Sequence, residues 1–222
     1  MCRFLVVKSK QPVYLASFLE SFSKMSEKSK TPDGDLQADG WGICWQNNKS
    51  WNFYKSIFPI WKSKEKFSRF PKSKLFLIHS RSSTFKKHKD NIAFNQPFVW
   101  NNFAYVFNGS ISKIRLKQKI MGEVGSQKIF YLIRQKFEEL ADLKKAIISV
   151  FNLIRQNSLR INGLNLSIIY NQKVYSFSFF TKYPDYYQLW FGKGGGIKVI
   201  SSEKIKGDLY WSKIKREEVF LI

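Results

Sequence analysis

Short apolar stretches typical of strands dominate the first half of the chain: the pattern repeats every two residues in residues 1–7, whereas residues 74–81 indicate a largely buried strand. Strands are predicted at residues 1–7, 40–46, 49–57, 74–81 and 98–111, with the second and third, and the two halves of the last, forming hairpins. Residues 13–25 instead carry apolar positions at helical spacing, and Pro12 is expected to open that helix. A polar loop with Pro-Asp-Gly turn chemistry follows at residues 26–35.

The period of the pattern changes in the second half. Two amphipathic helices are predicted at residues 126–140 and 142–156, separated at Ala141-Asp142. Strands resume at residues 164–171, 173–180, 186–191, 196–201 and 217–222. Strands, a helix pair and further strands without a linker predict a single α+β domain over residues 1–222.

Composition narrows the class of protein. The 222 residues include 38 Lys and Arg against 16 Asp and Glu, a net charge of +22, which raises nucleic acid or an anionic membrane as partner. The excess is spread along the chain without a basic block, so nucleic acid is not favoured. The densest stretch, residues 55–74, interleaves lysines with aromatics; this could bind single strands by stacking, but we favour a solvated loop whose aromatics turn inward.

No apolar run approaches the roughly 18 residues that span a bilayer, and the apolar start is too short for a signal peptide. We therefore expect a cytoplasmic protein without a membrane partner. Only two cysteines, Cys2 and Cys44, are present, which disfavours a disulfide framework and a zinc site. Cys44 lies in an aromatic strand and is expected to be an inert core thiol.

Several candidate sites are weak when each is taken alone. Asn108-Gly109 follows a strand and is most simply a turn, because both residues tolerate positive φ. Arg81 is most simply a surface charge at the end of a strand. The glycines of FGKGGGIKV lack the spacing of a phosphate loop and predict a bend between strands.

Taken together, six short motifs point to one family. They are MCRFL at the start, DGWGICW from Asp39, HSRSST from His79, NQPF from Asn95, VFNGSI from Val106 and GEVGSQKIFYLI from Gly122. Their order and spacing resemble those of the class-II glutamine amidotransferases, which are N-terminal-nucleophile hydrolases, and most closely the stand-alone members with a single type-2 domain. The closing segments, including Trp211, also fit, so the resemblance covers essentially the whole chain.

The resemblance implies a four-layer αββα sandwich with two antiparallel sheets, no cofactor and no metal. It also implies that Met1 is removed, so that Cys2 becomes the first residue and attacks an amide carbonyl through its thiolate. A free α-amine has a pKa near 7.7 to 8.0 and a thiol near 8.5, so the amine can take the thiol proton without a histidine. Asn108 and the N–H of Gly109 would bind the oxyanion, each donor contributing about 3 kcal/mol.

The resemblance further assigns substrate binding to Arg81, which would bind the α-carboxylate, and to Thr84, which would support that loop or the substrate. The family usually has an aspartate that pairs with the substrate's α-ammonium, but this chain has Gly125 in the sequence Val-Gly-Ser-Gln. Losing one partner of such a pair costs roughly 2 to 5 kcal/mol. Two family histidines are also replaced, by Phe107 and Gln96.

Three functions remain open at this point. The first is a glutamine amidotransferase in which Asp90 or Glu123 replaces the missing aspartate. The second is an amidase acting on a γ-glutamyl compound or another amide whose amine is blocked or absent. The third is a non-enzymatic relative that binds nucleic acid or a protein partner. The first two are favoured, and ammonia would be released or passed to a separate synthase subunit.

Overall fold

The computed structural model describes residues 1–48, 50–83, 88–117 and 119–222. Its described part contains two antiparallel sheets. The larger sheet has the strand order β11 (Tyr210–Lys213), β9 (Trp190–Gly194), β10 (Ile197–Ser201), β1 (Arg3–Tyr14), β4 (Lys72–Ser80), β2 (Trp41–Asn47) and β3 (Ser50–Ser56). The smaller has the order β12 (Val219–Leu221), β8 (Lys173–Phe180), β7 (Ser158–Tyr170), β6 (Phe103–Ile114) and β5 (Phe98–Trp100).

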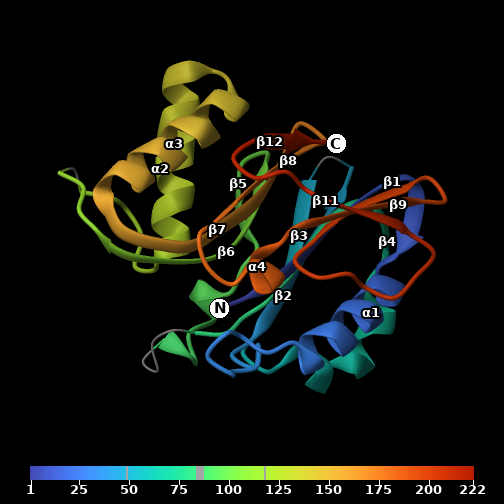
Figure 1. Ribbon diagram of the computed structural model, residues 1–222. Helices are drawn as coiled ribbons and strands as arrows, with labels where there is room; N and C mark the ends of the chain where they lie inside the picture. Colours follow the sequence, from blue (N-terminus) through green and yellow to red (C-terminus); the bar gives the residue numbers. More distant parts are fainter. Residues whose placement is uncertain (49, 84–87, 118) are drawn as a thin grey trace.

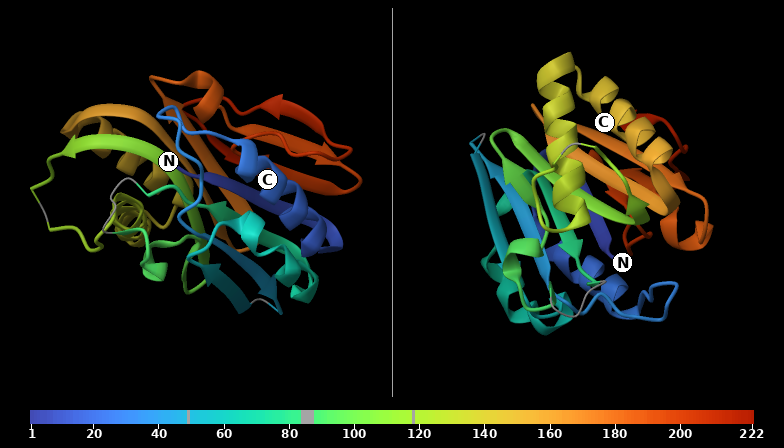
Figure 2. Two further views of the ribbon diagram at one scale, coloured as in Figure 1. Left: turned by 90° about the horizontal axis from the view of Figure 1, so that it is seen from below. Right: turned by 90° about the vertical axis from the view of Figure 1, so that its left-hand side faces the viewer.

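Helices cover the outer face of each sheet, so the molecule has four layers. Figure 1 shows α2 and α3 on one side and α1 on the opposite side, with the sheets between them, and Figure 2 shows the same layers from two further directions. The helical segments are α1 (Leu15–Lys28), η1 (Ile60–Lys62), η2 (Lys64–Arg69), η4 (Ile92–Phe94), α2 (Gly125–Leu140), α3 (Leu143–Asn157) and α4 (Pro184–Tyr187). The predicted αββα arrangement is confirmed.

Strand alternation explains how one strand serves two cores. In β1, Leu5 and Val7 pack with α1 in the outer core, whereas Phe4 and Val6 pack in the core between the sheets. The helices α2 and α3 bury one apolar face each on the smaller sheet, and Asp142 caps α3 by accepting a hydrogen bond from the N–H of Lys145 at 3.1 Å. The spacing of apolar residues in the sequence therefore indicates which face of each strand or helix packs into a core.

Three sequence predictions about the elements are wrong. The first helix begins at Leu15 and not at Pro12, because β1 continues through an irregular register between Lys8 and Val13, where a proline is tolerated. Tyr186 and Tyr187 lie in the short helix α4, and the following strand starts only at Trp190. Asn108-Gly109 is no turn but lies within β6.

The lysine- and aromatic-rich stretch from Lys55 to Lys74 folds largely as predicted: Trp61, Phe67 and Phe70 turn inward, whereas Phe58 stays 60% exposed. The stretch contains η1 and η2, and the ring of Phe67 is buried edge-on against Trp41. Phe70 also meets the Trp41 ring, at a centroid distance of 6.1 Å. These aromatics therefore complete the outer core beside α1.

Candidate functional site

Cys2 lies directly before β1, at the point where the two sheets meet. Its backbone N–H donates to Oδ1 of Asn108 at 3.0 Å, and its carbonyl accepts from the hydroxyl of Tyr186 at 3.0 Å. The Sγ atom is 3.8 Å from the carbonyl oxygen of Ser82, which follows β4. In Figure 1 the start of the chain lies in the middle of the molecule near α4. The fold thus brings four distant segments together around this half-buried thiol.

Asn108 is fully buried in β6, and its two amide atoms have different environments. Oδ1 accepts the hydrogen bond from Cys2, whereas Nδ2 has no hydrogen-bond partner among the described residues. Buried polar atoms are usually satisfied, so an unpaired buried donor calls for an explanation. An N–H pair held beside the nucleophile is the arrangement that binds an oxyanion.

Gly109 follows Asn108 in β6 and lines the cavity that opens beside Cys2. A Cβ atom at this position would lie 2.4 Å from the ring of Phe107 and 2.6 Å from the carbonyl oxygen of Gly163. Only glycine fits there. Phe107, which stands where the family often has histidine, is buried, and Gln96 bonds its backbone N–H and carbonyl.

A cavity of about 280 Å³ opens beside Cys2. Both polar and apolar groups line it, including Met1, Cys2, Arg81, Ser82, Ser83, His88, Gln96, Gly109, Glu123, Gly125 and Ile129. Four of the six predicted site residues therefore border one cavity, and Asn108 joins them through Cys2. Thr84, the sixth, lies outside the described residues.

Arg81 borders the cavity but is bonded elsewhere. Its side chain donates to Oδ1 of Asn95 at 3.0 Å, to Oγ of Ser83 at 3.1 Å and to the carbonyl oxygen of His88 at 2.5 Å. Burial lowers the pKa of the guanidinium, while the nearby Cys2 thiol and Asp39 carboxylate oppose that shift. In this structure the Arg81 guanidinium is taken up by contacts with Ser83, His88 and Asn95, so its binding of a carboxylate stays a prediction.

Gly125 begins α2 and leaves open space, since a Cβ atom there would meet nothing within 4 Å. Glu123, two residues earlier, also borders the cavity and carries a carboxylate. Asp90, the other carboxylate predicted to replace the aspartate, is exposed and does not line this cavity. Glu123 is therefore the better placed carboxylate to face a substrate near Gly125.

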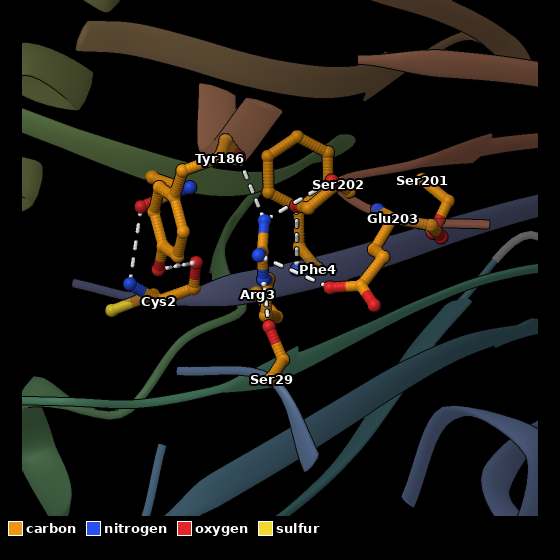
Figure 3. A network of polar contacts seen from close by, with 9 residues as sticks. Cys2, Arg3, Phe4, Ser29, Tyr186, Ser201, Ser202 and Glu203 are labelled. Atoms are coloured by element: carbon orange, nitrogen blue, oxygen red, sulfur yellow. Dashed lines mark hydrogen bonds and ion pairs between the residues drawn. The ribbon is translucent and has the colours of Figure 1, made fainter. Parts of the chain in front are cut away.

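Sequence reasoning missed the network behind the thiol, which Figure 3 shows. Arg3 is 4% exposed, and its guanidinium lies 3.9 Å from the ring centroid of Tyr186. It donates to Oγ of Ser29 at 2.7 Å and to the carbonyl oxygen of Tyr186 at 2.7 Å, and pairs with Glu203 at 3.1 Å. The network fixes Tyr186, which in turn holds the carbonyl of Cys2. The sequence carried a signal for it, because Arg3 directly precedes the buried apolar run Phe4–Val7.

Met1 occupies part of the candidate site. Its amino group donates to the carbonyl oxygen of Ser82 at 3.2 Å, and its sulfur contacts the hydroxyl of Tyr187. Its side chain packs against the cluster of Phe180, Tyr186 and Tyr187. With Met1 in place the nitrogen of Cys2 is an amide, which has no basic lone pair to accept a thiol proton.

Two further side chains with titratable groups, Cys44 and His79, lie in the core. Cys44 is fully buried, and burial raises the pKa of its thiol well above the usual range, so the expectation of an inert core thiol is confirmed. His79 is also fully buried, and desolvation together with the nearby Arg81 charge lowers its pKa to about 3. A histidine with so low a pKa is a poor general base at neutral pH.

The His79 shift gives a stability prediction. The unfolded chain takes up a proton at this histidine below about pH 6.5, whereas the folded protein does not until about pH 3, so stability falls as the pH drops. We expect His79 to account for a loss of up to about 2 kcal/mol between pH 7.5 and pH 5. Urea unfolding of the wild type and His79→Gln at both pH values measures it; equal pH slopes would contradict the assignment.

Comparisons with known proteins agree with this geometry. No family model matches the chain. A search of solved structures finds a glutamine aminotransferase class-II domain protein from Silicibacter pomeroyi, with a TM-score of 0.63 and 15% identity, covering 100% of this chain and 98% of that one. The chain has the fold of the class-II glutamine amidotransferases. The similarity that the six motifs predicted is thereby confirmed at the level of the fold.

Two further relatives are longer proteins. Glutamine phosphoribosylpyrophosphate amidotransferase from B. subtilis matches with a TM-score of 0.67 and 13% identity over 100% of this chain and 49% of its own. A curated protein of Saccharomyces cerevisiae, the probable glutamine amidotransferase DUG3, is 24% identical over 151 residues, which are 60% of this chain and 41% of that protein. Each of these two matches thus covers less than half of the relative's own length.

Within the described ranges, no group of three or more His, Cys, Asp or Glu side chains is arranged to hold a metal ion. None of the helices in the described part of the chain combines the length and apolar character needed to cross a bilayer.

Proposed function

We propose that the protein is an N-terminal-nucleophile amidohydrolase of the glutamine amidotransferase type, with Cys2 as nucleophile after removal of Met1. One observation carries the proposal: the nitrogen of Cys2 is bonded to Oδ1 of a buried Asn108, whose Nδ2 finds no hydrogen-bond partner in the described part of the chain. The same side chain can therefore orient the α-amine and stabilise the oxyanion. The cavity beside these atoms favours an enzyme over a purely structural or binding protein.

The reaction follows from these positions. The α-amine of Cys2 accepts the thiol proton, and the thiolate attacks the carbonyl carbon of the substrate amide. Nδ2 of Asn108 and the N–H of Gly109 stabilise the negative charge on the carbonyl oxygen. The ammonium of Cys2 then returns the proton to the leaving ammonia or amine, and water hydrolyses the resulting thioester with the amine again acting as base.

The substrate class follows from the groups around the cavity. Arg81 would have to release part of its loop contacts to bind a carboxylate, and Gly125 offers no partner for an α-ammonium. We therefore propose as substrate a γ-glutamyl amide whose α-amine is blocked or absent; glutamine and unblocked γ-glutamyl amides, which share the α-ammonium, would bind only if Glu123 pairs with it. The ammonia or amine would be released or passed to a separate synthase subunit.

A substrate screen tests this function. Glutamine, glutathione-like peptides and other γ-glutamyl amides are incubated with the protein lacking Met1, and release of ammonia or amine is measured against Cys2→Ala. We expect Cys2-dependent hydrolysis of at least one γ-glutamyl amide. If no amide in the panel is hydrolysed faster by the wild type than by Cys2→Ala, the proposed function is wrong.

The open space at Gly125 allows a gain-of-function prediction. Gly125→Asp places a carboxylate at the first residue of α2 without a steric clash, and the helix dipole favours an acid there. We expect KM for glutamine to fall by roughly 10-fold, because the new carboxylate can pair with the α-ammonium of a substrate bound in the cavity that residue 125 borders. The melting temperature should not fall.

Gly125→Asn is the matched control, since it adds the same volume without charge. It should leave KM for glutamine near the wild-type value. If the aspartate and asparagine variants have the same KM, then the substrate's ammonium does not lie near residue 125.

A further inference from the structure

Three lysines and a tyrosine form a row across the larger sheet, far along β1 from Cys2. Lys8 of β1 lies opposite Lys198 of β10, Lys198 lies opposite Lys193 of β9, and Lys193 lies opposite Tyr210 of β11. Directly opposite residues on neighbouring antiparallel strands point to the same face. We call these four residues the lysine row.

The lysine row begins where the smaller sheet no longer covers the larger one. Two residues further along the same strands, Val6, Ile200 and Phe191 belong to or pack against the core between the sheets. Lys8 is about 20 Å along β1 from Cys2, at a rise of about 3.3 Å per residue. In Figure 1 the labels of β9 and β11 likewise lie away from the amino terminus. The lysine row is therefore separate from the candidate active site.

The lysine row lines a hollow of about 470 Å³ beside the glycine-rich turn between β9 and β10. Gly195 and Gly196 have φ values of +54° and +76°, as a tight hairpin requires, which confirms the predicted bend. The turn carries no side chains that could fill the hollow. Tyr210 stands at one end with 80% of its surface exposed.

The lysine row places like charges directly opposite one another on neighbouring strands. Like charges directly opposite on neighbouring strands destabilise a sheet. Burial lowers the pKa of Lys8, and the charges of Lys198 and of Lys173 on β8 lower it further. Among the described residues, no carboxylate forms an ion pair with any of these lysines. A bound polyanion would relieve this repulsion.

We propose that the lysine row binds single-stranded nucleic acid, with successive phosphates on Lys8, Lys198 and Lys193 and a base stacked on Tyr210. Neighbouring strands lie about 4.8 Å apart, so the three lysines span about 10 Å, and their flexible side chains can reach consecutive phosphates. Stacking of a base on an aromatic ring contributes about 1 to 3 kcal/mol. A duplex offers Tyr210 no unstacked base.

Fluorescence anisotropy with a labelled oligothymidylate of about 12 nucleotides tests the proposal, because this length lies within known single-strand site sizes. The variant K8Q/K193Q/K198Q is compared with the control K24Q/K144Q/K182Q, which removes the same charge at three exposed lysines elsewhere. We expect the row variant to bind at least about 10-fold more weakly than the control. The salt slope is the change of log K with log salt concentration. For the row variant it should be smaller in magnitude by about 2, because three phosphate contacts are lost at about 0.7 each.

The remaining outcomes also decide the matter. Tyr210→Ala should weaken binding by about 5-fold or more through lost stacking. The row variant should melt at or above the wild-type temperature, since it removes repulsion, so loss of binding cannot be due to unfolding. Equal salt slopes for the two triple variants, equal affinity for a duplex, or equal competition by polyglutamate would overturn the proposal. Amide hydrolysis should be unchanged in the row variant.

Discussion

Replacement of Cys2 by alanine is expected to abolish amide hydrolysis while leaving the protein folded. The thiol is half-buried, and alanine would lose its weak contact with the carbonyl oxygen of Ser82 at 3.8 Å. The bonds of the Cys2 backbone to Asn108 and Tyr186 would remain. Removal of a nucleophile leaves binding and the oxyanion donors in place, so we expect a fall in kcat of about 1,000-fold or more. Release of ammonia or amine from the best substrate of the screen measures this effect.

Cys44→Ala is the matched control, because it removes the chain's other thiol. Cys44 is fully buried between the sheets, so this variant should lose some stability but keep hydrolysis largely intact. If Cys44→Ala is inactive at a temperature where it is folded, and Cys2→Ala is active, the nucleophile has been wrongly assigned.

Asn108→Asp is expected to have the second largest effect. This substitution keeps the shape and the acceptor for the nitrogen of Cys2 but removes the unpaired Nδ2 donor. Loss of one oxyanion donor costs about 3 kcal/mol, so kcat should fall by roughly 100- to 1,000-fold. The rate is measured with saturating substrate.

Alkylation of Cys2 by iodoacetamide serves as the control for Asn108→Asp. That reaction forms no oxyanion, so its rate should change by less than about 10-fold. If Asn108→Asp hydrolyses substrate at the wild-type rate and its Cys2 is alkylated at the wild-type rate, Asn108 does not stabilise the transition state. A variant in which both rates fall equally would show that Asn108 only positions Cys2.

Much of the fold was predictable because its cores are layered. The short apolar run in residues 74–81 predicts a strand buried on both faces, and the helical spacing in residues 126–156 shows which face of each helix is buried. The errors occurred where a local signal competes with long-range packing. Pro12 favours the start of a helix, yet β1 continues past it. Asn108-Gly109 has turn chemistry, but β7 pairs with it and extends β6.

The candidate site was predicted in part, through the resemblance of its motifs. Cys2 and Asn108 are 106 residues apart, so no local pattern shows that their atoms bond. The contacts of Arg3 with Tyr186, and of Arg81 with the loop after β4, depend on how distant segments meet. The lysine row was missed for the same reason, since it exists only in the register of four strands.

The central claim is that the polypeptide acts through a free Cys2, and the mass of the intact protein tests it most directly. The protein is produced without a tag at its amino terminus, and its mass and first peptide are determined. The account predicts a chain lacking Met1, whose first peptide begins Cys2-Arg3-Phe4. A protein that retains Met1 in full while hydrolysing amides would contradict it.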